Sequence, residues 1–102
     1  MPGPYDQLDY YPLRTFAFEA LPVGATAVGF TAATMVGAQC AAAKVETAQI
    51  RYRTDGTNPT ATVGVIADVG DTIIVYGNPD IVAFRAIRTG GASAVLSTEF
   101  SK

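Results

Sequence analysis

The 102-residue sequence has no histidine, no tryptophan and one cysteine, Cys40. Without histidine the chain has no His general base, no Ser-His or Cys-His pair and no His/Cys zinc site of its own. A lone cysteine forms no disulfide within the chain, and Cys40 lies in an uncharged alanine run with no neighbouring cation to activate it. We therefore expect no enzyme, no metal and no cofactor, but a protein that works through its surfaces.

Basic residues are also few, since seven Lys and Arg stand against nine Asp and Glu, for a formal net charge of −2. Nucleic-acid binding depends on a basic face, so no nucleic-acid partner is expected. The chain does not open with a basic region and an apolar run, so no signal peptide is predicted.

Residues 20–43 contain no charged side chain. That length would span a bilayer, but Ala, Gly and Thr dominate it, and such a segment gains little from hydrocarbon. We expect no membrane contact and, as the main interpretation, buried strands joined by small-residue turns. The alternative is an uncharged surface that docks on a partner, with Phe30 and Met35 among its contacts.

Residues 1–12 hold three of the six prolines and three of the five tyrosines, with no helical or alternating period. They are predicted to form an extended arm ahead of a single domain at residues 13–102. The arm is either a loose tail or a segment that orders on a neighbouring subunit. Its anchoring side chains would be Tyr5, Leu8, Tyr10 and Tyr11.

Short strand-like segments and turns fill the rest of the chain. A turn is predicted at Leu21–Gly24 and a loop or single helical turn at Ala38–Ala43, while a change of strand parity predicts a bulge or bend near Ala48–Gln49. The strands are expected within residues 13–19, 27–31, 44–53, 61–66, 72–76, 82–88 and 94–100, with turns that include residues 77–80. Six to eight such strands predict an all-β fold, an antiparallel β-sandwich or jelly-roll-like domain.

Two groups of charged residues are candidate sites. Asp55, Asp68, Asp71 and Asp80 stand in predicted turns without the spacing of a calcium loop, so they are interpreted as turn residues. Arg51 and Arg53 share one strand face and would meet carboxylates on a partner. The alternative gives them a solvated face with ion pairs to Glu46 or Glu99.

The second half of the chain contains a sequence pattern that resembles one found in a known group of proteins. The segment Ile50–Thr60 (IRYRTDGTNPT), followed by Val63-Gly64, Gly70-Asp71 and Phe84–Arg88 (FRAIR), is similar to small virion proteins of tailed bacteriophages and prophages. It covers about residues 43–100.

The resemblance implies a virion structural protein with no catalytic residues. The first expectation is a capsid decoration (cement) protein, whose partners are the major capsid protein or other virion proteins and further copies of itself. Its arm would lie across neighbouring coat subunits. It would be assembled in the host bacterial cytoplasm and located on the capsid surface. The alternatives are a tail or head–tail connector component and, from another class, a carbohydrate- or receptor-binding module.

Overall fold

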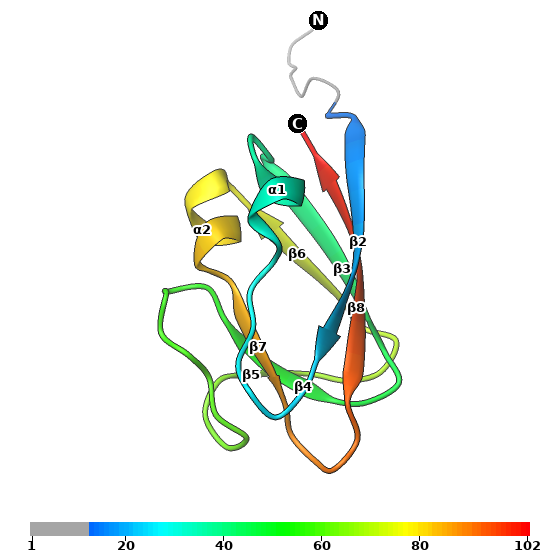
Figure 1. The fold of residues 1–102 in the computed structure, drawn as a ribbon, viewed down its shortest axis with the longest axis vertical. Helices are drawn as coiled ribbons and strands as arrows, with labels where there is room; N and C mark the ends of the chain where they lie inside the picture. The colour runs from blue at the N-terminus through cyan, green and yellow to red at the C-terminus, as the bar shows by residue number, and fades with distance from the viewer. Residues whose placement is uncertain (1–12) are drawn as a thin grey trace, which may run out of the picture.

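The strands of residues 13–102, the part of the chain that the computed structural model describes, form two antiparallel sheets (Figure 1). Residues 1–12, the predicted arm, lie outside the described residues. One sheet has the order β2-β8-β3-β6 and the other β5-β4-β7. The elements are β2 (Thr15–Val23), α1 (Ala32–Met35), β3 (Cys40–Glu46), β4 (Ile50–Arg53), β5 (Val65–Ala67), β6 (Thr72–Tyr76), α2 (Asn78–Ala83), β7 (Arg85–Arg88) and β8 (Ala94–Ser101). The predicted all-β sandwich is confirmed.

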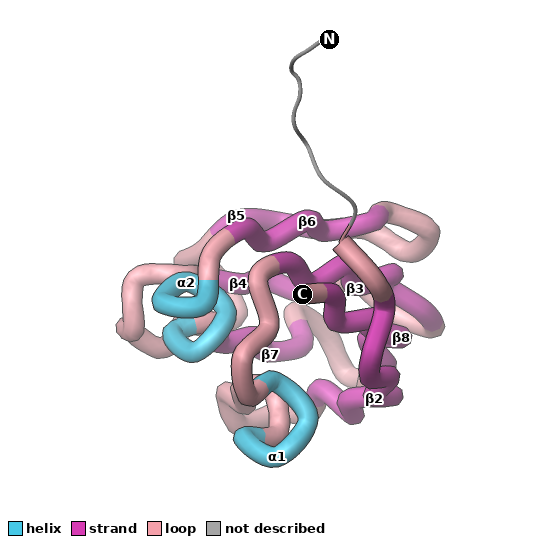
Figure 2. The backbone as a smooth tube through the Cα atoms, turned by 90° about the horizontal axis from the view of Figure 1, so that it is seen from above, coloured by secondary structure: helices cyan, strands magenta, loops and turns pink. Residues whose placement is uncertain are grey.

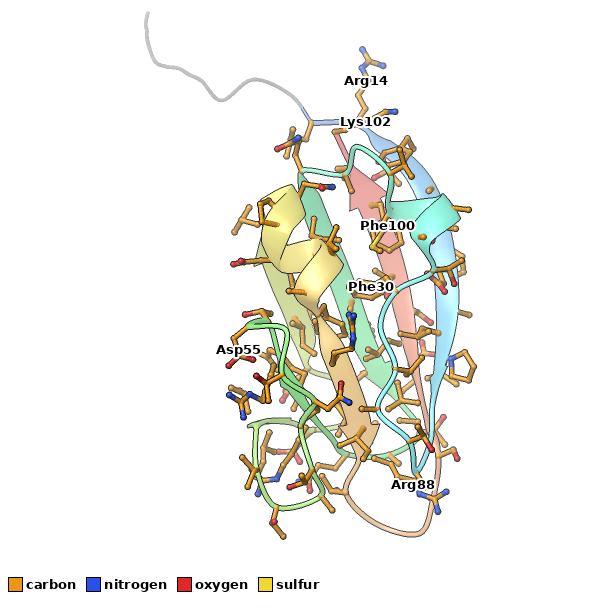
Figure 3. The ribbon with its side chains drawn as sticks, turned by 60° about the vertical axis from the view of Figure 1, so that its left-hand side comes forward. Arg14, Phe30, Asp55, Arg88, Phe100 and Lys102 are labelled. Atoms are coloured by element: carbon orange, nitrogen blue, oxygen red, sulfur yellow. The ribbon has the colours of Figure 1, made fainter. Side chains whose placement is uncertain are left out.

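The core lies between the two sheets and contains a cluster of aromatic side chains among its aliphatic residues. Phe30 stacks on Phe84 with ring centroids 4.4 Å apart and meets Phe100 edge-on at 5.1 Å, and Tyr52 stacks on Phe84 at 5.7 Å. Figure 3 shows Phe30 and Phe100 beside each other between the elements that carry them. Alternate residues of β8 complete this core, since one face of that strand is buried: Ala94, Leu96, Thr98 and Phe100.

Both short helices pack in the half of the sandwich that holds the C-terminus (Figures 1 and 2). Glu19, which faces inward from β2, holds α1 against the sheet through hydrogen bonds. Its carboxylate accepts bonds from the Thr31 N–H at 3.0 Å and the Thr34 hydroxyl at 2.9 Å. The Asn78 amide, at the start of α2, donates to the carbonyls of Met35 and Ala38 at 3.4 and 2.9 Å. These bonds join α1 and α2 to each other and to the sheet.

The predicted turn at Leu21–Gly24 is wrong, because β2 continues through Pro22 to Val23. Proline is tolerated there since β2 is an edge strand, where an N–H that faces away from the sheet is not needed. The strand predicted at residues 27–31 is reduced to one isolated bridge between Val28 and Ala86.

The predicted loop or helical turn at residues 38–43 is also wrong, since most of this segment belongs to β3, a central strand. Ala41 and Ala43 are fully buried there, so packing between the sheets overrides the helix propensity of alanine. The change of parity near residues 48–49 is a bend, as one of the two predicted alternatives has it, and not a bulge. The chain leaves one sheet after β3, passes through Thr47 at φ 81°, and enters the other sheet as β4.

Two further boundaries differ from the sequence prediction. The strand expected at residues 61–66 is the short β5, because Arg51 and a buried Pro59 hold the preceding loop out of the sheet. The turn at residues 77–80 and the start of the strand at 82–88 are replaced by α2, in which Pro79 sits in the first turn. Proline is favoured there because its missing N–H would have no helical partner.

Candidate interaction surfaces

The residues predicted to touch a partner are not brought together. Tyr5, Leu8, Tyr10 and Tyr11 lie outside the described residues. Phe30 is only 5% exposed and belongs to the aromatic core, while Met35 is half-buried and packs against that core. Phe30 is therefore a core residue, while Met35 packs against the core and remains partly exposed.

Arg51 and Arg53 lie on the outer face of the three-stranded sheet, as their spacing predicts, and both are engaged within the chain. Arg51 donates to the carbonyls of Ala61 at 3.1 Å and Gly64 at 2.7 Å. Arg53 pairs with Asp55 at 2.5 Å, which holds the pKa of Asp55 below its usual value and raises that of Arg53. The ion pairs expected with Glu46 or Glu99 are not formed, since Asp55 supplies the single salt bridge within residues 13–102.

A third arginine completes this face. Arg85 of β7 stands opposite Arg53 of β4, so two like charges occupy neighbouring strands. The Arg85 guanidinium turns back to donate to the carbonyls of Val82 at 3.0 Å and Phe84 at 2.7 Å, at the end of α2. Each of the three arginines therefore secures a loop or a helix end of its own chain.

The residues of the phage-like pattern build the loop between β4 and β5. Gly64, at φ +137°, sits so close to the chain that an added Cβ would lie 3.1 Å from Pro59 and 3.2 Å from Arg51. Asp55 accepts a bond from the Thr57 N–H at 3.1 Å, and Gly56 adopts φ +83°. The physical role of this pattern is to fold the loop against the sheet.

The predicted turn aspartates also serve the fold. Asp71 accepts a bond from the Asp68 N–H at 2.8 Å, and Asp68 accepts one from Gln49 at 2.6 Å. No group of three or more acidic or cysteine side chains in residues 13–102 is placed to hold a metal ion. Cys40 is half-buried, and burial raises the pKa of its thiol.

Comparisons with known proteins add no relative. No protein-family model, curated protein or solved structure matches the chain. In the described part of the chain, no helix is long and apolar enough to cross a membrane, and no pocket is present.

Exposed apolar side chains are the feature of these surfaces that sequence reasoning missed. Eleven large hydrophobic residues of the described chain are exposed: Leu13, Phe16, Phe18, Val36, Val63, Val65, Ile66, Val69, Ile74, Tyr76 and Val82. Three of them project from the outer face of the four-stranded sheet, Phe18 on β2 and Ile74 and Tyr76 on β6. Across the sheet, Glu99 of β8 and Ala42 of β3 lie between Phe18 and Ile74 on that face.

The outward orientation of Phe18 could have been predicted from the sequence. Leu21 and Val23 are inward-facing residues of odd number, so a strand that continues through Pro22 places Phe18 on the outer face. Phe16 departs from this alternation because the register shifts between Thr15 and Ala17. Its ring lies beneath the Lys102 ammonium, 4.4 Å from the ring centroid.

Proposed function

We propose that this chain is a bacteriophage virion structural protein, a capsid decoration protein that binds the lattice of the major capsid protein and stabilises it. The observation that carries the proposal is the number of exposed apolar side chains on a small two-sheet body. Phe18, Ile74 and Tyr76 are 59%, 47% and 71% exposed on one sheet face. Large apolar groups on a soluble surface favour contact with other proteins.

A repeated lattice suits such a surface. Each apolar contact is small, but a lattice presents the same site many times, and contacts made together raise the effective affinity. Residues 13–102 contain seven basic and seven acidic residues, so the body has no net charge. The two remaining acidic residues, Asp6 and Asp9, belong to the arm, and this acidic balance suits the outside of a shell better than its DNA-lined interior.

The exposed aromatic residues of the body give less support to a carbohydrate-binding module. Phe18 on β2 and Tyr76 on β6 stand at opposite edges of a four-stranded sheet, about 14 Å apart at the usual strand spacing. They do not form one platform on which a sugar ring would stack.

Copy number tests the proposal against its nearest alternative. We expect quantitative mass spectrometry of particles from the phage or prophage that encodes the chain to find on the order of hundreds of copies per particle, as a surface lattice requires. About six to twenty copies would identify a tail or head–tail connector component instead, because those assemblies are single rings. Absence from purified particles would refute a virion role altogether.

The arm has a separate test. The hydrogen bonds and core contacts described for residues 13–102 are all made among those residues. We therefore expect the truncated protein to fold, with the near-ultraviolet circular dichroism of the full chain, and to be lost from particles. Full incorporation of the truncated protein would show that the arm has no role in attachment.

A further inference from the structure

The sheet edge at β6 is open. The Gly77 N–H donates to the Gln39 carbonyl at 2.8 Å, and the Val45 N–H donates to the Asp71 carbonyl at 2.9 Å. Hydrogen-bonded pairs alternate along an antiparallel ladder, so the odd-numbered residues of β6 bond to β3. The even-numbered residues turn their N–H and C=O groups to the other side, where residues 13–102 supply no further strand.

The β6 strand lacks three features that normally prevent edge strands from pairing. The β6 sequence, Thr72-Ile73-Ile74-Val75-Tyr76, has no charge, proline or register shift. The β2 edge of the same sheet has all three kinds of protection: Pro22, a register shift at Phe16 and the inward-facing Glu19. Natural sheets guard their edges in these ways, so an unguarded edge indicates a pairing site.

The other sheet offers no comparable edge within the described residues. β5 has only three residues, and the outer side of β7 is bridged by Val28. A partner strand would therefore find its longest unprotected template at β6.

The chain itself contains a suitable strand. Tyr5–Tyr11 is a run of seven residues without proline, between Pro4 and Pro12. Tyrosine is favoured in strands, and three of the seven residues are tyrosines. The body of the protein has no net charge, so it carries no overall negative charge against this acidic segment.

The length of the arm determines which β6 edge it reaches. Arg14 is fixed by two backbone bonds with Lys102, each 3.1 Å, beside the edge opposite β6 (Figure 3). A strand added beyond the same copy's β6 would lie four strand spacings from β2, about 19 Å away. About six extended residues are needed to cover that distance, which would leave only Tyr5–Gln7 of the proline-free run to pair.

A neighbouring copy avoids this loss, because its β6 edge can lie beside the point where the arm leaves β2. We infer that Tyr5–Tyr11 of one copy adds as an extra strand to the β6 edge of a second copy of this chain. Donor and acceptor lie at opposite edges of the sheet, so each copy gives one arm and receives one. The association is head-to-tail and closes into a ring or continues as a chain. It requires no capsid, so it is separable from the proposed function.

Two full-length variants test the inference. The arm variant carries Gln7→Pro and Leu8→Pro together, because adjacent residues direct their N–H groups to opposite sides and the pair removes a bonded donor in either register. The edge variant carries Ile74→Pro, which removes only an N–H that faces the open edge. Ile74→Lys is its substitute if the proline disturbs the fold, and Gly3→Pro, outside the pairing run, is the matched control.

The mass of each protein is measured by light scattering over a concentration series, with circular dichroism to confirm folding. We expect the wild type and Gly3→Pro to exceed the 10.6 kDa of one chain, and each test variant to remain at 10.6 kDa. An equimolar mixture of the two variants should form a single one-to-one complex of about twice that mass, because the intact arm of one fits the intact edge of the other.

Three results would overturn the inference. A wild type that stays at the mass of one chain would show that the arm does not join copies. An arm variant that associates like the wild type would show that β6 pairs with another β6 instead. Two variants that remain separate in the mixture would show that arm and edge are not partners. Binding to capsids is measured separately, so it can fail or succeed independently of these results.

Discussion

Replacement of Phe30 distinguishes a core residue from a contact residue. Its ring is 5% exposed, stacked on Phe84 at 4.4 Å and set edge-on to Phe100 at 5.1 Å. Phe30→Ala should therefore remove a buried ring and leave a cavity, at a cost of about 3–5 kcal/mol. For a domain of this size that lowers the melting temperature by at least about 12 °C.

Phe18→Ala is the matched control, because Phe18 is 59% exposed on the outer sheet face. Its free energy of unfolding should change by no more than about 0.5 kcal/mol. Both values are measured by urea denaturation followed by circular dichroism. The reasoning is refuted if Phe30→Ala unfolds at the wild-type midpoint, or if Phe18→Ala is the more destabilised of the two.

Three smaller predictions concern the loops and α1. Gly64→Ala should lower the free energy of unfolding by about 2 kcal/mol and Gly56→Ala by about 1 kcal/mol. Both glycines have a positive φ, but of the two only residue 64 has close neighbours that an added Cβ would meet. Equal urea midpoints for the two variants would contradict this. Since Arg53 keeps the pKa of Asp55 below its usual 3.8, the stabilisation from their pair is complete above about pH 4 and is lost as the pH falls further. The melting temperatures of wild type and Asp55→Asn should therefore differ at pH 7 and converge in acid, and a constant difference would exclude the pair as the cause. Glu19→Ala should destabilise the protein by about 1 kcal/mol and speed amide hydrogen exchange in residues 31–35, because it removes the carboxylate that accepts bonds from Thr31 and Thr34. Unchanged exchange would show that this carboxylate does not hold α1 in place.

The fold class could be predicted from the sequence because short alternating segments and turn residues suffice to indicate a sandwich. The strands most visible in the sequence, β6 and β8, are those with regular alternation of buried and exposed residues. The errors fall where local preference and packing disagree. Ala41 and Ala43 favour a helix by propensity, yet they are buried in a central strand, and Pro22 suggests a turn but lies on an edge.

The candidate surfaces were less predictable, because the exposure of a side chain depends on which faces the tertiary fold covers. Phe30 stands in a charge-free segment that resembles a docking surface, and only the tertiary fold shows that it packs against Phe84. Ile74 and Tyr76 belong to an apolar run that is typical of a buried strand. They are exposed because their side chains project from the outer face of the four-stranded sheet, while Ile73 and Val75 of the same strand face the core.

Attachment to a shell is tested most directly by a density map of the particle produced by the phage or prophage that encodes this chain. The two-sheet body of residues 13–102 has a distinct shape, with both helices in the same half, and can be located in such a map (Figure 1). We predict that it occupies repeated positions over the outer surface of the capsid. Density for the body at the tail or the head–tail junction alone, or nowhere on the particle, would contradict the proposal.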